Sequence, residues 1–97
     1  MRKLPVPISF IWDLGNQRKN WEKHGVDYRE AEEIFLGKPL KIYRDLKHSQ
    51  KEDRLTALGK TEKERKLYIV LTVRYDKVRI ISARDQSRKE RKLYEKK

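Results

Sequence analysis

The sequence predicts an α+β fold, in which an N-terminal αα-hairpin packs on an antiparallel β-meander and a C-terminal helix follows the sheet. Helix caps and apolar residues at helical spacing occur in the first 37 residues. From residue 40 to residue 84 the period changes to the alternation typical of strands. A chain of 97 residues has room for one core, so we expect a single domain over residues 1–97.

The N-terminal part contains start and stop signals for two short helices. The first is expected between Asp13, a good N-cap residue, and Gly25, which is suited to the left-handed conformation at a helix end. Leu14 and Trp21 lie seven residues apart and therefore share one face of this helix. A capping-box pattern at residues 27–30 predicts the start of the second helix.

Strand-like alternation dominates the middle of the chain. The connections between the stretches are short enough for a meander, in which each strand pairs with the next one along the chain. A capping box formed by Ser87 with Glu90 predicts the C-terminal helix. The expected strands, including a short edge segment before the first helix, are residues 8–12, 40–44, 54–59, 66–75 and 78–84.

The chain is strongly basic. Its 26 Lys and Arg residues against 15 Asp and Glu residues give a formal net charge of +11, which attracts polyanions. Charge alone does not distinguish RNA, DNA, an anionic membrane surface and an acidic protein partner as ligands. The absence of cysteine excludes disulfide scaffolds, thiol nucleophiles and thiolate metal sites. No apolar stretch approaches the roughly 20 residues of a spanning helix and the N-terminus lacks a signal-peptide core, so we expect a cytoplasmic protein without membrane association.

The final hairpin is expected to place two arginines side by side. If residues 76–77 form a two-residue turn, Arg74 lies directly opposite Arg79. Like charges in that arrangement destabilise a sheet, so the pair favours an anion such as a phosphate between them; two side chains splayed into water are the alternative. The same register puts Tyr75 on the core face. It also turns Arg84 toward the core side, so Arg84 joins the pair only if a β-bulge or strand twist re-aims it.

The loop before the expected strand at residues 54–59 carries candidate proton-transfer groups. His48 titrates near neutral pH, and Glu52 could accept a proton if burial or partners tune its pKa. Their alternatives are a backbone hydrogen bond for His48 and an exposed ion pair of Glu52 with Lys51 or Arg54.

Further basic residues lie at the ends of the expected helices. Lys23 and His24 close the first helix, where the macrodipole favours cations, and Arg88 and Lys89 open the last one, where a solvated helix face is the alternative. All four are candidate RNA-binding residues. Two histidines without ligand-like spacing and the lack of a Gly-rich phosphate loop give no ground for a metal or a cofactor.

Short pieces along nearly the whole chain, from residue 10 to residue 95, fit one family pattern in order and spacing. They are Phe10-Ile11-Trp12-Asp13, Asn20 with Lys23-His24-Gly25-Val26, Glu30-Ala31 with Ile34-Phe35, Asp45 with His48-Ser49 and Glu52-Asp53-Arg54, Leu58-Gly59, Thr72 with Arg74, the stretch from Arg79 to Arg84, and Glu90-Arg91 with Tyr94-Glu95. In these residues the chain resembles the BrnT family, the toxin half of BrnT–BrnA type II toxin–antitoxin systems.

The resemblance implies a compact RelE-like ribonuclease fold, RNA cleavage that arrests growth, and neutralisation by a BrnA antitoxin. Because such an antitoxin carries a DNA-binding domain, DNA would be an indirect partner, and the toxin is expected to be oligomeric with its antitoxin. The chain departs from the family at Ile11, where an acidic residue is common, and in the basic turn at residues 37–39.

Metal-independent RNA cleavage needs a base for the 2′-OH, cations for the phosphate and an acid for the leaving 5′-oxygen. The hypothesis assigns phosphate stabilisation to Arg54, Arg74 and Arg79, with proton transfer by His48 and Glu52 in an undecided order. Arg84 is added through the resemblance. A non-catalytic nucleic-acid-binding module is the alternative, because phosphate contacts serve both classes; a protein whose cations mainly meet an acidic antitoxin is a third.

Overall fold

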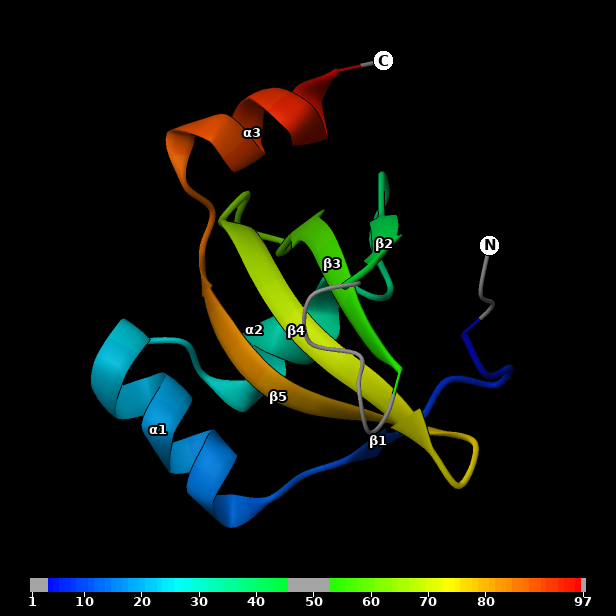
Figure 1. The fold of residues 1–97 in the computed structure, drawn as a ribbon. Helices are drawn as coiled ribbons and strands as arrows, with labels where there is room; N and C mark the ends of the chain where they lie inside the picture. The colour runs from blue at the N-terminus through cyan, green and yellow to red at the C-terminus, as the bar shows by residue number, and fades with distance from the viewer. Residues whose placement is uncertain (1–3, 46–52, 97) are drawn as a thin grey trace.

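A computed structural model describes residues 4–45 and 53–96 of the chain. The elements run in the order β1 (Phe10–Ile11), α1 (Leu14–His24), α2 (Tyr28–Glu33), β2 (Lys41–Arg44), β3 (Arg54–Lys60), β4 (Lys66–Arg74), β5 (Lys77–Asp85) and α3 (Arg88–Glu95). One sheet forms the centre, α1 and α2 lie beside it, and α3 lies at one end of it (Figure 1). The predicted α+β class and the C-terminal helix are confirmed.

The sheet is mixed, with strand order β1-β5-β4-β3-β2. Strands β2 to β5 form the predicted antiparallel meander. The expectation of a wholly antiparallel sheet is wrong at one edge, because β1 runs parallel to β5 and pairs Ile11 with Arg79. The edge of β5 that the meander leaves open would expose backbone groups, and β1 pairs part of it, as in the 2.8 Å bond from the Val78 N–H to the Ser9 carbonyl.

The predicted helix caps are confirmed, but the predicted face of α1 points outward. Asp13 accepts from the Asn16 N–H, and Gly25 has a φ of 63°. Leu14 and Trp21 are 78% and 60% exposed, so the face that they share does not enter the core. The buried residue of α1 is Asn20, whose amide oxygen accepts from the Ala83 N–H at 3.2 Å and so satisfies a backbone group of β5 beyond the end of β1.

The hydrophobic core lies on one face of the sheet, between the strands and the two N-terminal helices. Its members on the helix side include Val26, Ala31 and Ile34, which are at most 1% exposed. Alternate residues of the strands complete it, and the opposite face of the sheet is therefore free to carry other side chains. The strand residues of the core are Leu55, Ala57, Leu67, Ile69, Leu71, Val78, Ile80 and Ala83.

The turn of the final hairpin lies one residue earlier than predicted. Tyr75 and Asp76 connect the strands with φ values of 55° and 59°, which is the backbone geometry of a two-residue type I′ turn. Arg74 therefore pairs with Lys77, and the predicted pairing of Arg74 with Arg79 is wrong. Tyr75 was expected on the core face, but at the tip of the hairpin it is 84% exposed.

A register shift in the β4–β5 pair re-aims the end of β5. The shift lies between Val70 and Leu71 on β4, where Val70 pairs with Ser82 and Leu71 with Ile80. The extra residue on β5 is Ile81, which makes this a β-bulge. Arg84 consequently pairs with Tyr68, on the face away from the core. The β-bulge that was required to re-aim Arg84 toward this face is therefore present.

Candidate functional site

Three strands bring their arginines together on the face of the sheet away from the core, which we call the open face. Thr72 on β4 pairs with Arg54 on β3 and with Arg79 on β5, so the three residues form one row across the sheet. Arg74 lies two residues beyond Thr72 on the same face, opposite Lys77. We call Arg54, Arg74, Lys77 and Arg79 the cationic cluster.

Strand β4 lies between the two arginines of the row. Arg54 and Arg79 are two strand spacings apart, roughly 10 Å between Cα atoms, with Thr72 between them. Thr72 is 2% exposed, and its hydroxyl donates to the Asp53 carbonyl at 2.8 Å, which fixes the start of β3 beside Arg54. Thr72 thus separates Arg54 from Arg79, and the like charges that lie directly opposite each other are those of Arg74 and Lys77. The two long guanidinium side chains of the row stand on either side of one point.

Carboxylates lie near the cationic cluster at partly exposed positions. Arg79 approaches the Asp13 carboxylate at 3.8 Å, with the Asp13 side chain 49% exposed. Arg44 pairs with Asp53 at 3.3 Å. Exposed pairs of this kind contribute about 0–1 kcal/mol, so a phosphate dianion or backbone phosphate can compete with them.

The segment that carries His48 and Glu52 lies outside the described residues. Its neighbours on either side are described: Asp45 donates its backbone N–H to the Arg54 carbonyl at 2.8 Å, and Asp53 precedes β3. Both therefore lie at the same end of the sheet as Arg54. The proton-transfer roles of His48 and Glu52 stay predictions.

Arg84 shares the open face with the cationic cluster but lies farther along it. Its partner Tyr68 precedes Thr72 by four residues, which corresponds to roughly 13 Å along the strand. The Arg84 guanidinium pairs with both Glu90 carboxylate oxygens at 2.8 and 2.9 Å, and its central carbon lies 3.9 Å from the Tyr68 ring centroid.

The Arg84–Glu90 pair fastens α3 to the sheet. Burial raises the pKa of Glu90, but hydrogen bonds from Arg84 and from the Ser87 backbone outweigh it, so the pKa of Glu90 lies below its ordinary value. At the other end of α3, Lys41 donates to the Leu93 carbonyl and the Tyr94 hydroxyl donates to the Pro39 carbonyl. In this structure Arg84 thus holds a helix in place, and a contact with phosphate would require it to leave Glu90.

The four candidate RNA-binding residues lie at the other end of the sheet. Lys23 and His24 form the last turn of α1, and Arg88 and Lys89 begin α3; all are exposed. Both helix ends lie near Asp85, the last residue of β5. Asp85 pairs with Leu67, which is five residues from Thr72 along β4, so Asp85 lies roughly 17 Å from the row of Arg54, Thr72 and Arg79. These cations are not part of the cationic cluster.

Arg65 joins the end of α1 to the start of α2 and the end of β5, and no local sequence pattern predicts this role. Its guanidinium donates to Asp85 at 2.7 and 3.1 Å, to Glu30 at 3.1 and 3.2 Å, and to the carbonyls of His24 and Gly25 at 3.2 and 2.9 Å. The hydrogen bonds from Arg65 hold the pKa of Asp85 below its ordinary value. We call these contacts the Arg65 network; it holds the end of α1, which carries Lys23 and His24, against the end of β5.

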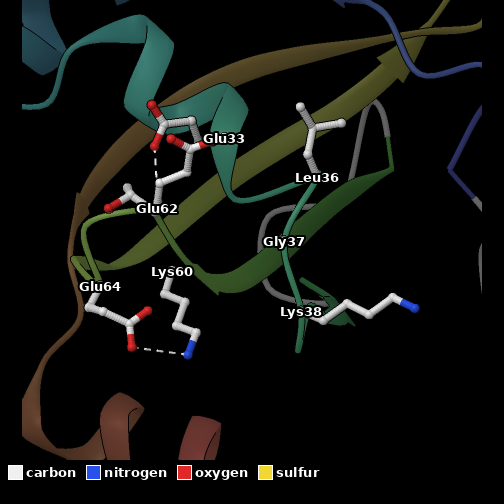
Figure 2. A pocket seen from close by; sticks show the side chains of 8 residues that line it. Glu33, Leu36, Gly37, Lys38, Lys60, Glu62 and Glu64 are labelled. Carbon is white, nitrogen blue, oxygen red and sulfur yellow. Dashed lines mark hydrogen bonds and ion pairs between the residues drawn. The ribbon is translucent and has the colours of Figure 1, made fainter.

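A pocket of about 240 Å³ lies apart from the cationic cluster, beside the end of β3 and the following turn (Figure 2). It is near Lys60, six residues along β3 from Arg54, or roughly 20 Å away. Three carboxylates line it: Glu64, which pairs with Lys60 at 3.3 Å, Glu62, and Glu33, which accepts from the Glu62 N–H at 3.1 Å. Two lysines, Lys38 and Lys60, also line it, so the charged side chains around the pocket carry a net negative charge that disfavours phosphate.

Two other features are absent from the described part of the chain. Residues 4–45 and 53–96 contain no cluster of three or more His, Cys, Asp or Glu side chains arranged to hold a metal ion. Across the same residues, the helices are too short or too polar for any to cross a membrane.

Comparison with known proteins places the chain in a family. A family model described as the ribonuclease toxin BrnT of type II toxin–antitoxin systems matches residues 12–90. The crystal structure of the Brucella abortus ribonuclease toxin BrnT is similar, with a TM-score of 0.61 and 25% sequence identity over 84% of this chain and 99% of that chain. A comparison with curated proteins gave no match. Because the family model covers most of the sequence, the chain belongs to the BrnT family of ribonuclease toxins of type II toxin–antitoxin systems.

Proposed function

We propose that this protein is an endoribonuclease toxin that cleaves RNA without a metal ion, by attack of a 2′-OH on the adjacent phosphate. The observation that carries the proposal is the row of Arg54, Thr72 and Arg79 on the open face, with Arg74 beside it. Guanidiniums on both sides of one strand can donate hydrogen bonds to the same phosphate from two directions, which suits the negative charge that develops there during cleavage.

The chemistry requires two proton transfers besides charge stabilisation. A base removes the proton from the 2′-OH, the 2′-oxygen bonds to phosphorus, and the bond to the 5′-oxygen breaks as an acid protonates that oxygen. The products are a 2′,3′-cyclic phosphate and a 5′-OH end. We assign the two transfers to His48 and Glu52, because the segment that carries them begins and ends beside Arg54 at Asp45 and Asp53.

The remaining residues have supporting roles in the proposal. Lys23, His24, Arg88 and Lys89 would hold the RNA backbone at the far end of the sheet, where they add to the field of a chain with net charge +11. Arg84 would contribute to the phosphate site only after exchanging its partner Glu90 for RNA.

At the level of the cell, RNA cleavage would inhibit translation and growth. A BrnA-type antitoxin would neutralise the toxin in a hetero-oligomeric complex in the cytoplasm and would supply the contact with DNA. The finer description of the fold, a RelE-like arrangement with an αα-hairpin, stays a prediction.

The test is cleavage of a defined RNA by the purified protein in the presence of EDTA, free and on ribosomes, with both new ends mapped. We expect cyclic phosphate and 5′-OH ends, and a loss of about 10²–10³-fold in rate for Arg79→Ala. Lys63→Ala is the matched control, since it removes one exposed positive charge from the turn after β3, and its rate is expected to stay within about two-fold of the wild type.

His48→Ala and Glu52→Ala test the proton-transfer assignments, and each is expected to lower the rate without lowering RNA affinity by a similar factor. A wild-type protein that binds RNA but leaves it intact under all these conditions would instead be the non-catalytic binding module.

A further inference from the structure

The tip of the β4–β5 hairpin carries an aromatic residue in a conformation that does not suit it. Tyr75 has a φ of 55° and is followed by Asp76 at 59°. The first position of a type I′ turn favours Asn, Asp or Gly, because a Cβ with a bulky substituent crowds the backbone in the left-handed region. A tyrosine there therefore holds its backbone in a strained conformation.

Nothing within the described part of the chain offsets this strain through the side chain. Tyr75 is 84% exposed, so burial gains little. The aromatic and cation–ring contacts recorded among residues 4–45 and 53–96 involve Phe10, Phe35, Trp12, Tyr28 and Tyr68, and none involves the Tyr75 ring. Folding of these residues therefore provides no reason for a large aromatic ring at this position.

The position does adjoin the cationic cluster. Tyr75 follows Arg74 directly, and Lys77, which pairs with Arg74, lies just after the turn. A nucleic-acid strand whose phosphates contact Arg74 and Arg79 would pass beside the hairpin tip with its bases on the side that the phosphates leave free. An exposed ring next to phosphate-binding cations is the usual arrangement for stacking an unpaired base.

We propose that Tyr75 is a base-stacking residue, which binds one unpaired nucleobase of the RNA whose phosphates lie on the cationic cluster. The inference rests on the proposed function for its ligand, RNA, and adds that the substrate is single-stranded at this point. Stacking accepts any base, since each has a π-face, so Tyr75 contributes affinity and register along the strand more than sequence choice.

A substitution that suits the turn better than tyrosine separates stacking from folding. Tyr75→Asn places a residue favoured at positive φ in the turn, so its melting temperature is expected to equal or exceed that of the wild type. Its affinity for a fluorescent, unstructured 12-nucleotide 2′-O-methyl RNA, which is resistant to 2′-OH attack, is expected to fall by roughly 5- to 150-fold. Tyr75→Phe is the matched control, because it retains the ring and is expected to bind within about two-fold of the wild type.

Two further measurements identify the mode of contact. The slope of log affinity against log salt concentration is expected to stay the same for Tyr75→Asn, which removes no charge, and to become shallower for Arg79→Ala. A set of oligonucleotides, each with one abasic nucleotide at a different position, locates the stacked base. At one position the missing base is expected to weaken binding to the wild type but not to Tyr75→Asn, because that variant has already lost the ring on which the base stacks.

The outcomes distinguish this inference from the proposed nuclease activity. If the wild type binds the RNA but fails to cleave any, and Tyr75→Asn still weakens binding with unchanged salt slope, the stacking role stands and the nuclease proposal fails. If the wild type cleaves and Tyr75→Asn binds and cleaves like it, the stacking role is overturned. It is also overturned if the wild type binds no RNA, or if every abasic position affects the wild type and Tyr75→Asn equally.

Discussion

Replacing Arg65 by alanine is expected to destabilise the protein far more than a surface substitution does. The side chain is 28% exposed and its guanidinium joins the C-terminus of α1, the first turn of α2 and the end of β5. Its ion pairs with Glu30 and Asp85, whose side chains are 30% and 62% exposed, are each worth about 1 kcal/mol or less. Its charged hydrogen bonds to two backbone carbonyls are worth about 1 kcal/mol each.

Together these contacts predict a loss of about 2–4 kcal/mol in the free energy of unfolding for Arg65→Ala, measured by urea denaturation at pH 7. For a domain of this size, the corresponding fall in melting temperature is roughly 10–20 °C. Arg65→Lys is expected to lie between the two proteins, because a single ammonium group does not reproduce the forked donors of a guanidinium. Lys63→Ala, in the same turn, is expected to change stability by less than about 0.5 kcal/mol. If Arg65→Ala were as stable as Lys63→Ala, the Arg65 network would not hold these elements together.

Two other changes test the core and the acid dependence of stability. Gly59→Ala is expected to lower the free energy of unfolding by about 1–3 kcal/mol, because a Cβ there would lie 2.8 Å from the Ile34 Cβ. If urea denaturation showed this variant to be as stable as the wild type, β3 and the end of α2 could move apart without penalty. Because Arg65 lowers the pKa of Asp85, the pair stabilises the protein above the ordinary carboxyl pKa near 4 and loses this effect as the pH falls through the lower folded value. The stability deficit of Asp85→Asn is therefore expected to be largest near pH 6 and to shrink below about pH 4, whereas a deficit that is constant down to pH 2 would contradict the assignment.

The features that the sequence predicted correctly are those encoded within a few residues. In each capping box, Asp27 with Glu30 and Ser87 with Glu90, the side chain of one residue accepts a hydrogen bond from the backbone N–H of the other. Such reciprocal contacts span three residues, so they could be predicted without knowledge of the fold. The strands of the meander were visible because alternate residues face one core. The family resemblance over residues 10–95 is confirmed by the match over residues 12–90.

The features that the sequence did not predict depend on contacts between distant segments. The partners of Arg65 are 20 to 41 residues away along the chain, so no local pattern marks it. The parallel pairing of β1 with β5 joins the two ends of the sequence. Leu14 and Trp21 have the spacing of a buried face, yet the buried residue of α1 is the polar Asn20, because a backbone N–H of β5 needs an acceptor there.

The error in the β4–β5 register has a different cause and leads back to the candidate site. The alternation of apolar residues through Val73 and Tyr75 suggested a strand that continues to the tyrosine, and Asp76 with Lys77 as the turn. The structure turns one residue earlier, at the cost of holding Tyr75 at positive φ. The shift exchanges the facing pair of Arg74 and Arg79 for the facing pair of Arg74 and Lys77, which is also like-charged, and it places Arg79 across Thr72 from Arg54. A sequence that departs from local preference at one place usually gains something else there, and here the same turn both places Arg79 across Thr72 from Arg54 and leaves an exposed aromatic ring beside Arg74.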